Sequence, residues 1–209
     1  IDKHAFYFSS INTILIPANV THICEGAFSS CYNLNKVEFA PKSQLLIIDN
    51  CSFAHSSVET FSIPSCLNSI GDSSFNGCRF LTNIEIPIDS KLEIIGNYAF
   101  SNSSIRSFTI PTYLKEIRKS FYSCFNLEKI IVPINSQLKK IEKESFLMTS
   151  IKSFYIPHHI TNFQGSLNGC NSLQIIELSE NSSLKEIDEI IQDDLGQEIL
   201  LMIPVKQKK

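Results

Sequence analysis

Apolar side chains recur along this chain in a triplet with the spacing L-x-x-I-x-I. The last part of each triplet alternates apolar and polar positions with a period of two, which is typical of a short strand with one buried face. The pattern therefore predicts a series of short strands whose middle residues enter a common core. The eight strand centres expected are Ile14, Val37, Phe61, Ile84, Phe108, Ile130, Phe154 and Ile176.

An aromatic anchor precedes each triplet and marks one repeated unit. The anchors are separated by 22, 25, 22, 25, 21, 25 and 21 residues, so turns of about 22 and 25 residues alternate. A unit this short cannot bury its own apolar face and must stack on its neighbours, which makes a solenoid. The anchors are Phe6, Phe28, Phe53, Phe75, Phe100, Phe121 and Phe146, with Leu167 in the same slot of the next unit.

These patterns predict an elongated, right-handed solenoid with one continuous parallel β-sheet and no long helix. A proline follows most triplets, where its missing amide donor ends the strand, and a second apolar pair then returns to the core. Residues 1–209 are expected to form one domain of about eight to nine turns, with a degenerate capping turn at about 188–209. Because the chain opens inside a repeat, we interpret it as a fragment of a larger protein.

The stretch IPANVTHICEGAFSSCYNL, residues 16–34, carries a specific resemblance. It is similar to the leucine-rich repeat in its BspA-like form, whose turns read roughly I-P-x-x-V-x-x-I-G-x-x-A-F-x-x-C-x-x-L. The resemblance covers the chain up to about Ile187, and its Asn, Ser, Ile and Lys-rich surface looks most like copies from mucosal protozoan parasites. It implies a leucine-rich-repeat solenoid of the α/β class, mostly strand and irregular coil, and a surface antigen that adheres to host cells or extracellular matrix.

Charge and hydropathy argue against two classes of partner. A net charge of -3 gives no reason to bind nucleic acid or anionic lipid. The longest apolar run, Ile199 to Val205, has seven residues and contains Pro204, whereas a membrane span needs about 20. We therefore expect no nucleic-acid partner and no membrane insertion by this segment.

Four of the seven cysteines occupy one slot in alternate turns: Cys31, Cys78, Cys124 and Cys170. Neighbouring members are two coils apart, about 10 Å at the spacing of strands, whereas a disulfide needs Cα atoms within about 7 Å. No metal-ligand spacing such as C-x-x-C occurs. The pattern predicts buried, reduced thiols that pack in the core with the Phe anchors. Cys24, Cys51 and Cys66 lack a repeat partner, and a bridge from one of them to a neighbouring turn stays open.

Groups suited to catalysis are sparse. His158 and His159 follow Pro157, but no carboxylate or cysteine stands near them at a ligand spacing, and exposed turn histidines are the simpler interpretation. The acidic residues near the C-terminus lack the D-x-D-x-D-G order of a calcium loop. We expect no catalytic residue, no metal and no cofactor.

Two columns of outward residues flank the inward residues of each triplet. Most members are small or polar, but Ile131, Tyr155 and Ile175 form an apolar cluster near the C-terminal end, flanked by Lys129 and Glu177. Such a patch on a solvated face can mark a contact site for a protein partner. Two alternatives stay open: these side chains are isolated β-formers, or a further C-terminal repeat covers them.

The sequence therefore predicts a non-catalytic protein-binding module of a cell-surface or secreted protein, with a host cell-surface or matrix protein as ligand. The alternative is a cytoplasmic scaffold that docks one protein partner, a compartment that suits free cysteines. A third possibility is a structural spacer whose open ends associate end to end.

Overall fold

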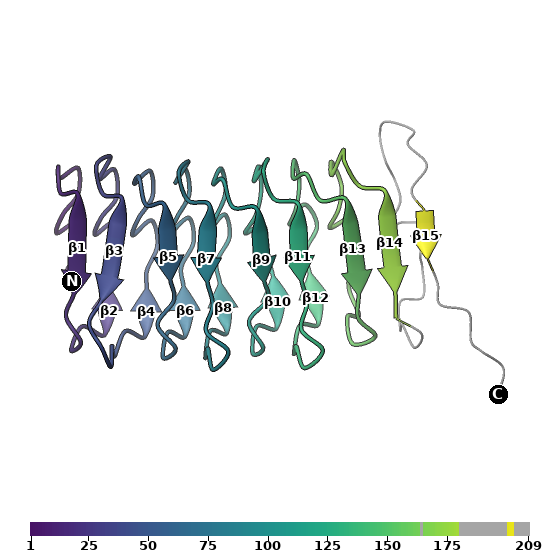
Figure 1. The fold of residues 1–209 in the computed structure, drawn as a ribbon, viewed down its shortest axis with the longest axis horizontal. Coiled ribbons are helices and arrows are strands. Elements are labelled where there is room, and N and C mark those ends of the chain that lie inside the picture. Colours follow the sequence, from purple (N-terminus) through teal and green to yellow (C-terminus); the bar gives the residue numbers. More distant parts are fainter. Residues whose placement is uncertain (164, 180–199, 203–209) are drawn as a thin grey trace.

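Stacked coils of strand and turn make an elongated rod in the computed structural model, which describes residues 1–163, 165–179 and 200–202. The front strands in Figure 1 run downward, the rear strands run upward, and the chain advances from left to right. The coil is therefore right-handed, as predicted. The described residues contain strands and turns but no helix.

The front of the rod is a single row of strands, one from each coil. Their central residues are buried and their flanking residues are mostly exposed, which is the period-two pattern expected from the sequence. All eight predicted strand centres lie in this row, and that prediction is confirmed. In the described residues the row comprises β1 (Thr13–Ile16), β3 (Lys36–Phe39), β5 (Thr60–Ser62), β7 (Asn83–Glu85), β9 (Ser107–Thr109), β11 (Lys129–Ile131), β13 (Ser153–Ile156), β14 (Ile175–Leu178) and β15 (Leu200–Met202).

Parallel ladders join the front strands in groups rather than as one uninterrupted sheet. The groups are β1-β3, β5-β7, β9-β11 and β13-β14-β15. Each of the first three unites a short coil with the long coil that follows it, so the alternation of turn lengths predicted from the sequence also sets the grouping of the front ladders. The coil after each group is joined to that group by a backbone hydrogen bond just ahead of its front strand. For example, Glu59 N donates to Asn35 O at 3.2 Å.

The predicted capping turn at about 188–209 lies outside the described residues except for β15. That strand pairs in parallel with β14, with Ile175 opposite Leu200 and Glu177 opposite Met202. The front row of strands thus continues beyond the last predicted strand centre.

A second row of two-residue strands forms the rear wall, where the sequence analysis predicted only a return of apolar side chains to the core. In each strand the second residue is buried, because it belongs to the second apolar pair of the unit. Ladders run through β2-β4-β6-β8 and then through β10-β12. In the described residues the junction between the fourth and fifth coils therefore has no ladder in either row. The rear strands are β2 (His22–Ile23), β4 (Ile47–Ile48), β6 (Ser69–Ile70), β8 (Ile94–Ile95), β10 (Glu116–Ile117) and β12 (Lys140–Ile141).

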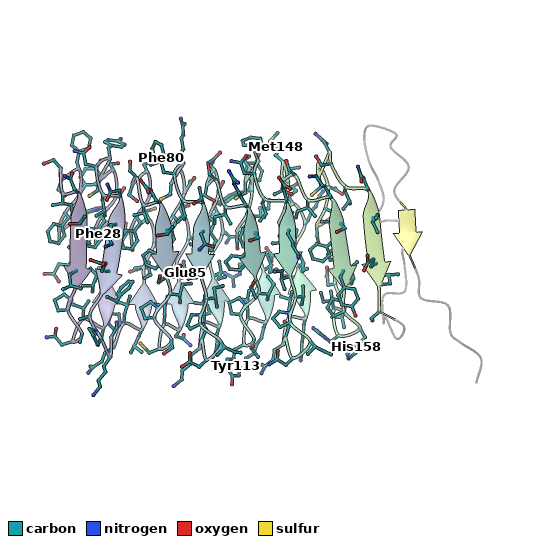
Figure 2. The ribbon with its side chains drawn as sticks, viewed as in Figure 1. Phe28, Phe80, Glu85, Tyr113, Met148 and His158 are labelled. Atoms are coloured by element: carbon teal, nitrogen blue, oxygen red, sulfur yellow. The ribbon has the colours of Figure 1, made fainter. Side chains whose placement is uncertain are left out.

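The Phe anchors form a continuous stack along the core. From Phe6 to Phe146, consecutive ring centroids are 5.0 to 5.8 Å apart and consecutive planes differ by 5 to 21°. The six anchors from Phe28 to Phe146 are fully buried, and Figure 2 shows Phe28 inside the rod. Phe61 and Phe108 of the front strands meet this stack at steep angles. Ring stacking adds a directional contribution to the apolar burial that holds the coils together.

The four slot-sharing cysteines are buried beside this stack, and all seven cysteines of the chain are free. Each buried Sγ donates to the carbonyl of the anchor one coil earlier, at 2.9 to 3.1 Å. Each also lies 3.3 to 3.5 Å from the hydroxyl in the same slot of the preceding short coil. These hydroxyls belong to Ser9, Ser56, Ser103 and Thr149. Each of these carbonyls also accepts the backbone N–H of the residue three positions later, so the thiol is a second donor to it and its own S–H is paired in the core.

Close stacking of the third and fourth coils requires glycine at position 96, four residues before the anchor Phe100. A Cβ added to Gly96 would lie 2.5 Å from the backbone nitrogen of Asp72 and 2.4 Å from its Oδ1 atom. The same carboxylate accepts a hydrogen bond from Asn97 N at 2.7 Å, which ties the two coils at this point. Glycine is therefore needed here for backbone approach rather than for an unusual conformation.

Candidate functional site

The candidate site is the outer surface of the front strands, where outward side chains line up in two columns. Parallel register places Thr13 beside Lys36 in one column and Ser62 beside Glu85 in the other. Lys36 and Glu38 form an ion pair at 2.7 Å within β3, and the Ser62 hydroxyl donates to the Glu85 carboxylate. The N-terminal and central parts of this face are thus mainly polar and partly self-paired.

The predicted apolar cluster divides into a pair and a third, separate residue. Ile131 and Tyr155 lie in the same column on the neighbouring strands β11 and β13, and their side chains are 40% and 48% exposed. Ile175 lies in the other column, opposite Ser153, and is only half-buried. We define Ile131 and Tyr155, with Ile175 at its border, as the strand-face patch.

Charged side chains border the strand-face patch on both sides. Lys129 and Glu177 are exposed, and Glu177 lies directly opposite Tyr155 in the parallel register. Glu128 and Lys152 directly precede strands β11 and β13. Lys152 Nζ lies 3.2 Å from Glu128 Oε2, and both side chains are more than half exposed. Exposed pairs of this kind contribute little to stability, so these charges are available to orient a partner.

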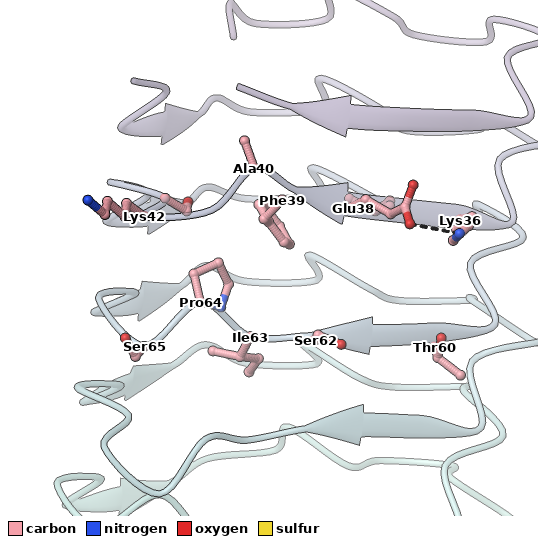
Figure 3. Close-up of a pocket in the computed structure, with 12 residues that line it drawn as sticks. Lys36, Glu38, Phe39, Ala40, Lys42, Thr60, Ser62, Ile63, Pro64 and Ser65 are labelled. Atoms are coloured by element: carbon pink, nitrogen blue, oxygen red, sulfur yellow. Dashed lines mark ion pairs between the residues drawn. The ribbon is translucent and has the colours of Figure 1, made fainter. Parts of the chain in front are cut away.

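A hollow that the repeat pattern did not predict lies on the same face, between β3 and β5. It has a volume of about 540 Å³ and lies where the front ladder is interrupted. Figure 3 shows Lys36 and Glu38 at one end of the hollow, with Phe39 and Pro64 toward the other. The sequence signal that could have indicated this hollow is Phe39, which occupies a position that holds Ile or Val in most other units.

The described residues offer little for catalysis. They contain no group of three or more His, Cys, Asp or Glu side chains placed to hold a metal ion. His158 is exposed and lies near the lower edge of the rod in Figure 2, and its ring is 5.2 Å from that of His159. Burial, and then the neighbouring His158, lower the pKa of His159. In the part of the chain that the structure describes, no helix has the length and apolar character needed to cross a bilayer.

Solved structures of bacterial proteins share this architecture. A leucine-rich repeat protein from Bacteroides ovatus superposes with a TM-score of 0.71 at 26% identity, over 85% of this chain and 52% of that one. This chain therefore spans about half the length of that protein. The leucine-rich repeat protein of T. pallidum gives a TM-score of 0.60 at 24% identity, over 82% of this chain and 69% of that one. No functionally curated protein matches the sequence.

A family model for the BspA type leucine rich repeat region matches residues 1–120 and 93–191, with six copies. These matches include all the long and short coils from the first anchor to β14. The stacked anchors, the cysteine slot and the short parallel strands are the structural form of that repeat. The chain therefore belongs to the BspA-type leucine-rich repeat family, a repeat fold suited to protein interaction.

Proposed function

We propose that this chain is a non-catalytic binding module of a cell-surface or secreted protein, and that it adheres to a protein of host cells or of the extracellular matrix. The observation that carries the proposal is the strand-face patch, because large apolar side chains are adjacent on neighbouring strands there, whereas the exposed Leu15 has Glu38 as its neighbour in the column. Ile131 and Tyr155 have no partner in the core, whereas the buried residues beside them, Ile130 and Phe154, fill it. Tyr combines contact area with a polar tip, which favours protein interfaces.

The strand-face patch is small, so it represents the centre of an interface rather than all of it. A specific protein interface buries about 800 Å² on each partner, with a few central residues supplying most of the affinity. Lys129, Glu177 and the pair Lys152 and Glu128 form the polar rim that such interfaces carry. As rim charges they should affect the association rate more than the final affinity.

Replacing Ile131, Tyr155 and Ile175 together with serine is expected to weaken binding to immobilised matrix protein or epithelial cells by about tenfold or more, because central apolar anchors dominate affinity. Surface binding of the labelled proteins measures the effect, and circular dichroism verifies that the variant is folded. Leu15→Ser is the matched control, since Leu15 lies in the same column near the other end and is 61% exposed. Full binding by the folded triple variant would remove the strand-face patch as the site.

One observation favours a second candidate, a cytoplasmic scaffold that docks a protein partner. All seven cysteines are free, and free thiols are more common in reducing compartments. The binding surface would be the same, but the partner would be cytosolic. A signal peptide or downstream transmembrane helix in the parent gene would favour the surface role, and a complete parent gene without either would favour the scaffold.

A further inference from the structure

Three exposed aromatic side chains lie along the loop edge above the front strands. In the long coils these are Tyr32, Phe80 and Phe125, with exposed fractions of 58%, 62% and 61%, and we call them the aromatic edge. Phe8 of the first, short coil is exposed as well, and its ring meets that of Tyr32 edge-on with centroids 5.6 Å apart. Each lies between the cysteine and the leucine of C-x-x-L in a long coil, and Figure 2 shows Phe80 at the upper edge of the rod. The last long coil carries Asn171 and Ser172 in these two slots, so the fold does not require an aromatic residue there.

The aromatic edge has a regular spacing along the rod, with Phe80 one position later in its loop than Tyr32 and Phe125 are in theirs. Its members come from the second, fourth and sixth coils, and each interval of two coils is about 10 Å at the spacing of neighbouring strands. The loops are fixed from the following short coils. Ser57 Oγ donates to the carbonyl of Tyr32 at 2.5 Å, and Ser150 Oγ donates to that of Phe125 at 2.6 Å. Ser104 Oγ makes the same bond at 2.6 Å to Arg79, the residue before Phe80.

Each aromatic residue is next in sequence to a side chain with N–H donors. These neighbours are Asn33, Arg79 and Asn126, and all three are exposed. Between the first two rings lies a hollow of about 380 Å³, lined by Tyr32 and Phe80 together with Asn33, Asn35 and Glu59. The edge therefore presents aromatic rings together with amide and guanidinium N–H donors and one carboxylate.

We propose that the aromatic edge binds a proline-rich segment in the polyproline II conformation. This helix repeats every three residues and rises about 3.1 Å per residue, so its equivalent side chains recur about every 9.3 Å, close to the two-coil interval. Its carbonyls have no internal hydrogen bonds, and the donors beside the rings can satisfy them. Proline rings packed against aromatic side chains are a known mode of recognition for such segments.

Other regular peptides fit this spacing less well. On one face of an extended strand, side chains recur about every 6.8 Å, which is out of step with the rings. An amphipathic helix presents an anchor about every 5.4 Å, so alternate anchors would meet the short coils. The third and fifth coils carry Ser57 and Ser104 at this level, and only beside Tyr32 does a short coil add a ring, that of Phe8. The site is separate from the strand-face patch, and this inference goes beyond the proposed function.

A labelled peptide of about twelve prolines is the probe, with a glycine-serine peptide of the same length as its control. Saturable binding in the micromolar to millimolar range is expected for the proline peptide alone, measured by fluorescence anisotropy. To reach all three rings the segment must span about 19 Å, or about seven residues. Affinity should therefore rise as the peptide is lengthened to about seven prolines and change little beyond about nine.

The variant Tyr32→Ser, Phe80→Ser, Phe125→Ser should weaken binding of the twelve-proline peptide by about tenfold or more. All three side chains are exposed, so the fold should persist. The matched control is Ile88→Ser with Ile134→Ser, because these isoleucines project fully into solvent from other loops of the rod and should not affect peptide binding. Absence of saturable binding at millimolar peptide, equal binding of the glycine-serine peptide, or full binding by the aromatic variant would each overturn the proposal. If chitohexaose binds and the proline peptide does not, the proposal is overturned and the aromatic edge is assigned to an extended glycan.

Discussion

Phe75→Ala is expected to lower the free energy of unfolding by about 3 to 5 kcal/mol, as truncation of a buried aromatic residue does. Phe75 is fully buried and touches three other rings. It stacks between Phe53 and Phe100, with centroids 5.1 and 5.5 Å away, and meets Phe61 edge-on at 4.8 Å. The alanine variant loses all three contacts and leaves a cavity that the stacked coils cannot easily close.

Urea denaturation followed by circular dichroism measures this effect. Because each coil touches only its neighbours, the lesion can divide unfolding into two transitions, which the shape of the curve would reveal. Phe80→Ala is the matched control, since Phe80 lies five residues away in the same coil but is 62% exposed, and it should change stability by less than about 0.5 kcal/mol. A loss below about 0.5 kcal/mol for Phe75→Ala would contradict the role of the Phe stack as the core.

Cys78 and Cys124 are expected to react with a thiol reagent at least about 100-fold more slowly in the folded protein than in the unfolded chain. Burial raises the pKa of both thiols from 9.0 to about 11, so at about pH 8 their reactive thiolate fraction falls about 100-fold. Exclusion of the reagent from the core slows the reaction further. Cys51 is exposed and serves as the internal control.

Peptide mapping after alkylation measures each thiol separately. On denaturation without reductant, all seven cysteines should become reactive, because all are free. Labelling of Cys78 as fast as Cys51 would contradict the burial of the four slot-sharing cysteines.

The same pKa difference makes stability depend on pH. Between about pH 9 and 11 the unfolded thiols lose protons that the folded ones keep, so the contribution of Cys78 and Cys124 to stability should be constant below that window and fall as pH rises through it.

The repeat pattern predicted the front strands and the anchors because both depend on residues within one coil. Ile14 and Phe28, for example, occupy positions whose burial is determined by a local apolar period. The grouping of the ladders was not predictable in this way, since it depends on how coils of unequal length meet. From Lys36 to Ile47 the long coil advances eleven residues, whereas from Thr60 to Ser69 the short coil advances nine.

The candidate surfaces were predicted only in part, for related reasons. Ile131 and Tyr155 share a column because they have the same place in the triplet. Ile175 is half-buried, and β15, a strand that lies well beyond the last complete triplet, pairs beside it. The aromatic edge was not predicted because Phe80 lies one position later in its loop than Tyr32 does. The aromatic residues therefore do not share one column when the repeats are aligned.

The junction between the fourth and fifth coils gives the rod an uneven stiffness. Ladders are missing there from both rows of the described strands, and the backbone bonds that remain gather at the anchor loops, as where Phe75 N donates to Ala99 O at 2.7 Å. Under a bending load the rod should therefore flex as a hinge at this junction, with its axis at the loop edge and perpendicular to the length of the rod. The rings of the aromatic edge lie at the level of that axis and keep their separation, whereas the lower loops on either side of the junction move apart. Two stiff arms joined in this way can change the angle between their surfaces without unstacking the core.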